Sequence, residues 1–233
     1  MVDAGIVNPS RDAGLSPQTI GGAACIVLDT GSVIAVESLT NIQGLTWTTH
    51  LSLTFPIDAK LKDGSPVQLV LAGERDVEPL RDLYRIIVDE GTSYPHDRFP
   101  DHDDFMDYWF RGKSTVAAYV PDRVSTSKMA GAFYLKPNWP GRAKQVANAG
   151  FIVAQNWRGK GLGWLLGATM LEYARQLGYR SVIFNLVFSE NVLARRLWER
   201  LGFKELGVIP RAVRKNDGTY QDAIIMFRTL WDD

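Results

Sequence analysis

The chain has 233 residues, of which 45% are hydrophobic and 11% aromatic, and this is enough apolar material for a packed core. Its 26 basic and 26 acidic residues cancel, which argues against a general electrostatic attraction to nucleic acid or to an anionic membrane. The single cysteine, Cys25, excludes an internal disulfide, no Cys/His cluster has zinc-ligand spacing, and no apolar run is long enough to span a bilayer. We therefore expect a soluble, cytoplasmic protein without a metal site.

Residues 1–40 are predicted to form an N-terminal extension, and residues 41–233 a single domain. The first 20 residues are rich in Gly, Pro, Ser and Asp, have no periodic pattern, and are expected to be mobile. Two apolar runs then flank the tetrapeptide DTGS at residues 29–32, a pattern that is typical of a β-hairpin.

The next elements alternate between strand and helix patterns. Residues 67–71 form an apolar run, and residues 73–91 follow with apolar side chains at helical spacing. The sequence DFMDYWF, residues 104–110, predicts a second short helix. The apolar runs 115–120 and 129–135 are separated by a polar segment, which predicts an antiparallel pair of strands.

The pattern becomes clearer after Ala149. Residues 151–153 are predicted to be a strand, and a helix with one apolar stripe follows and ends at Gly178. A strand at 181–188, a helix at 192–203 and a strand at 222–230 complete the chain. This order predicts an α/β (α+β) fold in which helices cover a mixed sheet.

Four glycines lie in the sequence QNWRGKGLGWLLG, residues 155–167, although each glycine inside a helix costs about 1 kcal/mol relative to alanine. The only Gly-Lys-Ser begins at Gly112 and has Asp107 where a Walker loop needs glycine. A dinucleotide fingerprint would need glycine or alanine at Leu166. Two interpretations remain. Arg158-x-x-Gly161-x-Gly163 forms a strand-to-helix turn whose amides bind an anion, or the glycines merely permit close packing.

The motif RGKGLG, followed by a strand and by N-x-x-A-x-x-L-W-E-x-L-G-F, resembles the acetyl-CoA-binding half of the GCN5-related N-acetyltransferases (GNAT). Residues 131–138 (GAFYLKPN), 148–151 (NAGF), 177–188 and 222–225 are similar to a fungal branch that acetylates the proline analogue L-azetidine-2-carboxylate. The similarity runs from about Gly44 to Leu230. It implies the GNAT fold with a mostly antiparallel central sheet, acetyl-CoA as co-substrate, a small amino acid as acceptor, a role in detoxification, and a homodimer.

The resemblance also assigns residues to acetyl-CoA. A backbone amide near Ile152 or Val153 would polarise the thioester carbonyl, and one such donor is worth about 3 kcal/mol of barrier. Asn191 would contact the pantetheine arm, but asparagine is also a favoured helix N-cap, so both roles remain open. The segment expected to bind the pyrophosphate comprises Arg158, Gly159, Lys160, Gly161, Leu162 and Gly163.

Asn148 and Asn185 are the candidate catalytic and acceptor-binding residues. In VIFNLVF, strand alternation puts Asn185 on the same face as Ile183 and Val187, where an unpaired amide would cost roughly 1 to 3 kcal/mol. Its partner is therefore a neighbouring backbone group, a buried water or, as in the fungal relative, the substrate carboxylate. Asn148 is either a turn or strand-end residue or, as in the relative, lies near the substrate amine. Phe151 and Tyr94 are expected to line the acceptor pocket.

The groups that move protons are harder to identify. Trp198 occupies the position where the wider superfamily often has a tyrosine acid, so the thiolate is expected to leave unaided. His96 and His102 lie in an acidic loop and are either bases or solvated surface groups. A water held by Asn148 or Asn185 is the favoured route for the amine proton.

The leading hypothesis is an N-acetyltransferase for a proline analogue such as L-azetidine-2-carboxylate or cis-4-hydroxyproline. One alternative is an acetyltransferase for another small amine, such as a primary amino acid, a polyamine or a xenobiotic. The other alternative is an acetyl-CoA-binding sensor without turnover.

Overall fold

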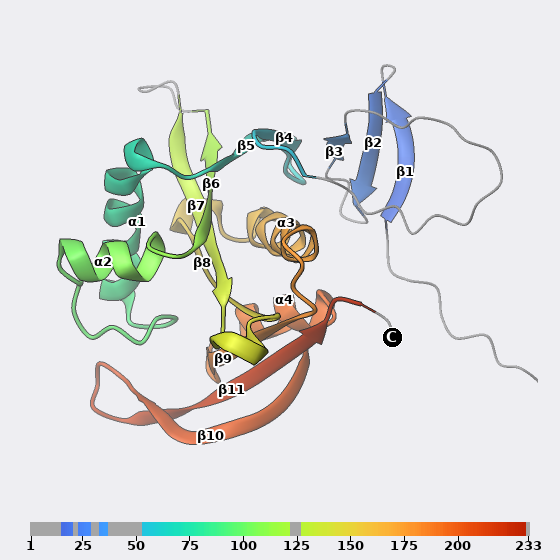
Figure 1. Cartoon of the computed structure of the whole chain (residues 1–233). Coiled ribbons are helices and arrows are strands. Elements are labelled where there is room, and N and C mark those ends of the chain that lie inside the picture. Colours follow the sequence, from blue (N-terminus) through green and yellow to red (C-terminus); the bar gives the residue numbers. More distant parts are fainter. Residues whose placement is uncertain (1–14, 21–22, 29–32, 37–52, 122–126, 232–233) are drawn as a thin grey trace, which may run out of the picture.

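The computed structural model describes residues 15–20, 23–28, 33–36, 53–121 and 127–231. These residues form two sheets (Figure 1). The smaller sheet contains β1 (Leu15–Ile20), β2 (Ala23–Leu28) and β3 (Val33–Val36), in that order. The antiparallel pairing of β2 with β3 confirms the hairpin predicted around residues 29–32.

Strand β1 was not predicted, because its residues belong to a segment expected to be mobile. It pairs with β2 along its whole length, from Leu15↔Leu28 to Ile20↔Ala23, so the backbone ladder orders a sequence that shows no strand pattern of its own. The expected mobility of residues 1–14 and the domain boundary at residue 40 lie outside the described residues.

The larger sheet has the order β10-β11-β9-β8-β7-β6-β5-β4. All its neighbouring strands are antiparallel except β8 and β9, which are parallel. This arrangement confirms the expected mixed, mostly antiparallel sheet. Its strands are β4 (Ile57–Lys60), β5 (Pro66–Leu71), β6 (Ser114–Val120), β7 (Lys128–Pro137), β8 (Val146–Val153), β9 (Ser181–Phe188), β10 (Lys204–Arg214) and β11 (Tyr220–Thr229).

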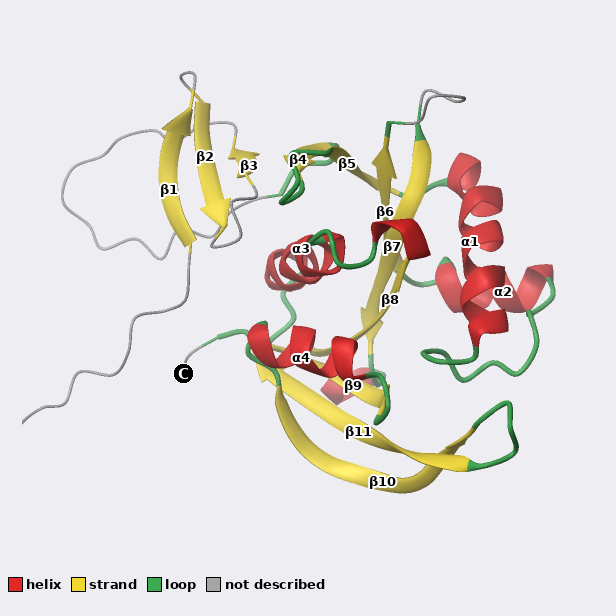
Figure 2. Cartoon of the chain, turned by 180° about the vertical axis from the view of Figure 1, so that it is seen from behind, coloured by secondary structure: helices red, strands yellow, loops and turns green. Residues whose placement is uncertain are grey.

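Helices cover both faces of this sheet (Figures 1 and 2). Helices α1 (Val77–Glu90) and α2 (His102–Trp109) pack on one face, and α3 (Leu162–Gln176) and α4 (Val192–Arg200) on the other. Alternation along β7 supplies both cores, because Phe133 packs towards α3 and α4 whereas Tyr134 packs towards α1 and α2. Three short 3-10 turns complete the order: η1 (Glu74–Asp76), η2 (Gly141–Ala143) and η3 (Gln155–Trp157).

Strands β4 and β10 were missed for a physical reason. Strand β4 alternates between buried and exposed side chains, but it has only four residues, too few for a clear pattern. Strand β10 exposes nearly every side chain and so lacks the apolar alternation of a strand with one buried face. Among the described helices, none has the length and apolar character needed to cross a membrane.

Candidate active site

The parallel strands β8 and β9 form a fork. They pair only at Val146↔Ser181, Ala147↔Val182 and Asn148↔Ile183, although β8 continues to Val153 and β9 to Phe188. Beyond Asn148 the edge of β8 that would meet β9 has no strand partner among the described residues. The fork therefore leaves backbone donors and acceptors of β8 available to other groups.

Backbone groups of β8 point alternately towards β7 and into the fork. The amide of Ala154 donates to Ala130 O on the β7 side. Because successive amides of a strand point to opposite edges, those of Phe151 and Val153 point into the fork. Tyr94 Oη donates to Phe151 O at 3.1 Å, and Arg158 Nε donates to Val153 O at 3.1 Å. Side chains thus occupy the two carbonyls, and the geometry favours Val153 over Ile152 as the amide that would polarise a thioester.

The four glycines divide between two roles. Gly159 and Gly161 have φ of 77° and 96°, a left-handed conformation that shapes the turn into α3. No side chain caps the α3 amides at Gly161, so they suit an anion. A Cβ on Gly163 would lie 3.4 Å from Leu197 Cδ2, and one on Gly167 would lie 2.5 Å from Leu201 Cδ1. The last two glycines therefore allow α3 to pack closely on α4.

The cationic side chains of this loop already have partners within the protein. Arg158 forms an ion pair with Glu90 at the end of α1, with Nη2 to Oε2 at 2.7 Å. Lys160 places its ammonium 4.4 Å from the centre of the Trp157 ring. Arg158 thereby ties the loop to α1, and a phosphate contact by either residue stays a prediction.

Asn148 lies at the vertex of the fork. It is buried, and its Nδ2 donates to Ile183 O at 2.9 Å. Ile183 is also its partner in the last residue pair of the β8–β9 ladder. This contact gives Asn148 a backbone partner where its pairing with β9 ends, and its place near the substrate amine stays a prediction. It also fixes the side-chain amide at the point where the strands separate.

Asn185 is exposed, so the expectation that its amide lies buried in an apolar strand is wrong. An irregularity in the β9–β11 pairing, between Ile224 and Met226, interrupts the regular alternation of β9 beside it. Nδ2 of Asn185 donates to Asn138 Oδ1 at 2.6 Å.

Asn138 was not singled out from the sequence, although it is the last residue of the GAFYLKPN segment. Its own Nδ2 is buried without a hydrogen-bond partner among the described residues. Exchanging N and O in both amides of the pair preserves the contact and leaves the other amide atom of Asn138 unpartnered. Asn138 therefore offers an unused polar atom beside Asn185.

Aromatic rings fill the fork on the side of α4. The ring centres of Phe151 and Phe184 each lie 4.7 Å from that of Trp198, whose side chain is buried. An indole N–H has no acidity useful for protonating a thiolate. Trp198 is thus a packing residue in this structure, in agreement with the expectation that no tyrosine acid stands at this position.

The opposite face of the sheet carries a pocket of about 370 Å³ between the α1–α2 connection, α2 and the ends of β6 and β7. Tyr94 is buried beside this region and does not line the pocket; its ring packs edge-on against Tyr84, with centroids 5.1 Å apart. The pocket is lined by His96, Asp97, Arg98, Pro100, Asp104, Asp107, Tyr108, Lys113 and Lys136.

The two loop histidines differ in their surroundings. His96 lines the pocket, contacts Tyr84 Oη through Nδ1 at 2.7 Å, and lies edge-on to Tyr108 with ring centroids 4.7 Å apart. Burial lowers the pKa of His96, and the nearby carboxylates of Asp97 and Asp104 offset this only in part. His102 is exposed and contacts Arg81. Of the two, His96 is the one placed to act in the pocket.

Asn191 begins α4, and its Oδ1 accepts a hydrogen bond from Ala194 N at 3.1 Å. Asn191 therefore acts as the N-cap. A contact between its Nδ2 and a pantetheine arm stays a prediction.

Within the described part of the chain, no group of three or more His, Cys, Asp and Glu side chains is arranged to hold a metal ion.

Comparison with known proteins places this geometry in context. A model of the acetyltransferase (GNAT) family matches residues 80–203. The N-acetyltransferase aca1 of Schizosaccharomyces pombe is 36% identical over 151 residues, which are 59% of this chain and 72% of that protein. A Bacillus subtilis protein described as a putative phosphinothricin acetyltransferase, YwnH, is 28% identical over 174 residues, covering 70% of this chain and 98% of its own. The solved structure of a GCN5-related N-acetyltransferase from Kribbella flavida superposes with a TM-score of 0.63 at 30% identity, covering 70% of this chain and 97% of that one.

Proposed function

Since the chain belongs to the acetyltransferase (GNAT) family and is an acetyl-CoA-dependent N-acetyltransferase, we propose that its acceptor is a small amino acid of the proline-analogue type. L-azetidine-2-carboxylate and cis-4-hydroxyproline are the compounds that the similarity to the fungal branch suggests. The observation that carries the proposal is the pair of asparagines at the fork, Asn148 at its vertex and Asn185 on the strand that diverges from it. Acetylation would detoxify such analogues by blocking the amine.

The residues around the fork fit acetyl-CoA. The amide of Val153 is placed to polarise the thioester carbonyl, and the uncapped amides at the start of α3 suit a pyrophosphate. Gly159 and Gly161 leave the backbone of the turn bare for a close approach, because a Cβ on Gly159 would meet nothing within 4 Å and one on Gly161 only the Lys62 side chain. Asn191 Nδ2 would hold the pantetheine arm.

The two asparagines would orient the acceptor. Nδ2 of Asn148 is bound to Ile183 O and Nδ2 of Asn185 to Asn138 Oδ1, so each side chain has a carbonyl oxygen to offer. The oxygen of Asn148 can accept a hydrogen bond from the attacking amine, and either oxygen can hold a water that removes the amine proton. Exchanging N and O in the Asn185–Asn138 pair frees Nδ2 of Asn185 to donate to the substrate carboxylate, as in the fungal relative. Phe151 and Tyr94 would contact the acceptor from the fork, where Tyr94 Oη donates to Phe151 O. The thiolate leaves without a dedicated acid, because Trp198 replaces the tyrosine.

Thiol release from acetyl-CoA tests the proposal directly. The acceptor panel contains L-azetidine-2-carboxylate, cis-4-hydroxy-L-proline, L-proline, primary amino acids and polyamines, and free coenzyme A is followed with a chromogenic thiol reagent. We expect selective turnover of the cyclic imino acids. Turnover of primary amino acids or polyamines instead would replace the substrate while keeping the reaction. Acetyl-CoA binding without turnover of any amine would indicate a sensor.

We further propose that the protein is a homodimer that meets its partner through the edge strand β10. This strand ends the sheet order and exposes three apolar side chains: Leu206, Val208 and Ile209. Exposed apolar edge strands favour pairing with another chain. A second copy of this chain is the partner that the family resemblance suggests.

A further inference from the structure

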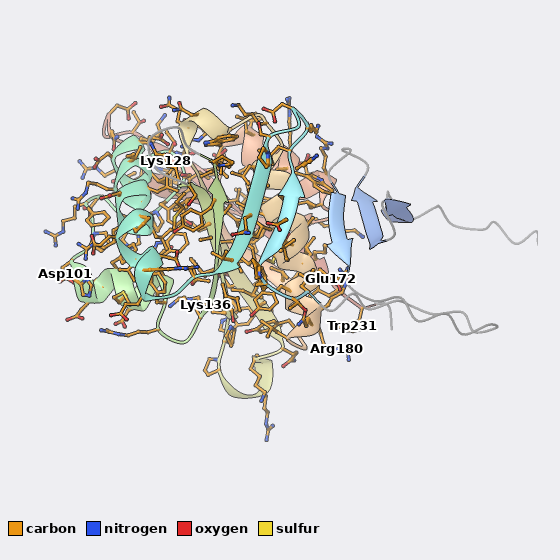
Figure 3. The ribbon with its side chains drawn as sticks, turned by 90° about the horizontal axis from the view of Figure 1, so that it is seen from above. Asp101, Lys128, Lys136, Glu172, Arg180 and Trp231 are labelled. Atoms are coloured by element: carbon orange, nitrogen blue, oxygen red, sulfur yellow. The ribbon has the colours of Figure 1, made fainter. Side chains whose placement is uncertain are left out.

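The pocket on the α1 and α2 face is lined by three basic and three acidic side chains besides His96, and the basic ones include a partly buried lysine at the end of the sheet. Lys136, near the end of β7, is only partly exposed, and it has neither an ion pair nor a side-chain hydrogen bond among the described residues. Its position beside the α1 and α2 layer can be followed in Figure 3. A partly desolvated ammonium without a counter-ion is unfavourable unless a ligand supplies one.

A second lysine faces the same pocket. Lys113 donates to the backbone carbonyls of Asp107 and Arg111, which hold its ammonium at the end of α2. Burial lowers the pKa of Lys113, the charge of Lys136 lowers it further, and Asp107 offsets these effects only in part. The two ammonium groups are therefore close enough to repel each other, and an anion between them would relieve that repulsion.

The pocket's own carboxylates do not neutralise this pair. The Asp107 carboxylate is bound by Arg111, with Nη1 to Oδ1 at 2.8 Å. Asp97 and Asp104 are exposed and form no ion pair with either lysine. The positive charge is thus at the sheet end of the pocket, where Lys136 lies, whereas Asp97 and Asp104 belong to the α1–α2 connection and to α2.

Strand register connects this charge to the fork. Lys136 lies directly opposite Asn148 in the β7–β8 ladder, so the two side chains leave the same face with Cβ atoms about 5 Å apart. Asn138 follows two residues later, and its side chain contacts Asn185. An anionic group held here would lie beside Asn148, which is assigned to the amine, and near the Asn138–Asn185 pair.

We propose that Lys136, with Lys113 behind it, binds the carboxylate of the amino acid acceptor and thereby selects amino acids over simple amines and polyamines. This inference rests on the proposed function and adds a positive charge to the carboxylate contact that the fungal relative makes through the asparagine matching Asn185. The lysine would bind the carboxylate of a small amino acid, and the amide oxygen at the fork would bind its amine. A polyamine would meet repulsion from the same lysines.

The test compares an amino acid that the enzyme turns over with its own primary amide, which has the same amine and ring but no charge. Steady-state kinetics are measured for the wild type, Lys136→Met and Lys113→Met. Lys128→Met is the matched control, because Lys128 is an exposed lysine at the other end of the same strand (Figure 3). Thermal unfolding checks that every variant is folded.

We expect the wild type to prefer the acid over the amide. Lys136→Met should raise the KM for the acid by about 10- to 100-fold, as for loss of a hydrogen bond to a charged group, without changing the KM for the amide or for acetyl-CoA. Lys113→Met should shift the same ratio less, and Lys128→Met not at all.

Two results would overturn the inference in distinguishable ways. If an amino acid is turned over but a folded Lys136→Met retains the wild-type preference for acid over amide, the carboxylate site is wrong and the proposed function stands. If no amino acid is turned over while another amine is, both the proposed function and the carboxylate site are wrong.

Discussion

At the scale of single residues, the contact between Asn185 and Asn138 joins β9 to the end of β7 across the start of β8. An exposed amide is free to rotate unless a partner fixes it, and Asn138 is the partner that the structure supplies. Asn138 is therefore a positioning residue for the proposed role of Asn185, and its own side chain need not touch the substrate.

Replacing these amides should separate catalysis from cofactor binding. Asn185→Ala is expected to abolish acetyl transfer while leaving the Kd for acetyl-CoA nearly unchanged, and Asn138→Leu to lower kcat without removing Asn185. Because Asn185 is exposed, its loss should change the unfolding free energy by no more than about 0.5 kcal/mol. Kinetics and acetyl-CoA titration measure the two effects.

The control for this pair is Gln68→Ala, which removes another amide from a cross-strand contact, with Asp58 Oδ1 at 2.8 Å, near the far edge of the sheet. It should leave kcat unchanged. An equal loss of acetyl-CoA affinity in the Asn185 and Asn138 variants would contradict the division of labour.

His96 should make stability depend on pH. Burial places its folded pKa below the ordinary value of about 6.5, so the unfolded chain takes up the proton first as the pH falls. The unfolding free energy that His96 contributes is present above pH 6.5 and is lost as the pH falls through the folded pKa.

Urea unfolding at pH 7.5 and pH 5.5 measures this loss. The decrease should be smaller in His96→Gln than in the wild type, whereas the exposed His102→Gln should behave as the wild type does. Identical decreases in the wild type and His96→Gln would show that the imidazole is not desolvated in the fold.

At the scale of elements, the turn from β8 through η3 to α3 combines two demands. Its backbone must bend sharply at Gly159 and Gly161, and α3 must then lie close to α4 through Gly163 and Gly167. The bend leaves the first amides of α3 open to an anion. The close packing on α4 fixes the position of α3, whose N-terminus presents these amides.

Gly161→Ala should weaken both the fold and acetyl-CoA binding. Alanine at a φ of 96° costs about 1 to 2 kcal/mol, and the change distorts the turn that exposes the α3 amides. Gly64→Ala is the matched control, since Gly64 also has a positive φ of 80° but lies in the β4–β5 turn with nothing within 4 Å of its Cβ. Urea unfolding should show losses in both variants. Isothermal titration should show weaker acetyl-CoA binding in Gly161→Ala alone; unchanged affinity there would argue against an anion site at this turn.

At the scale of the whole molecule, the sheet ends on one side in β10, which exposes the apolar side chains of Leu206, Val208 and Ile209 among charged ones. The same strand hydrogen-bonds to β11, so one backbone edge remains available for a partner. The proposed homodimer would cover this edge in both copies.

Light scattering coupled to gel filtration tests the dimer. The wild type should have the mass of two chains, and Leu206→Glu combined with Val208→Glu should reduce it to one, because the charges would be buried against the partner. Lys204→Glu on the same strand introduces a charge at an already charged, exposed position and should leave the mass unchanged. A monomeric wild type would overturn the proposed assembly.

Local patterns in the sequence were sufficient for much of the architecture. The helical spacing of apolar residues predicted α1, α3 and α4, because each of these helices buries one face. Apolar runs predicted β5, β6, β7, β9 and β11, of which β6 and β7 are buried on both faces of the sheet. Strand β10 has no such apolar pattern because nearly all of its side chains are exposed. The exposure of Asn185 depends on a pairing irregularity with β11, which local alternation cannot reveal.

The sequence by itself therefore determined the class of fold, the family motifs and the glycine turn, all of which depend on residues close together in the chain. Only the tertiary structure decided which amides of β8 face the fork, that Asn138 holds Asn185, and that Lys113 and Lys136 meet in one pocket with His96. These relations join residues that are far apart in sequence, and they depend on strand register and on which strands stop pairing. Neither is recorded in the periodicity of a single segment.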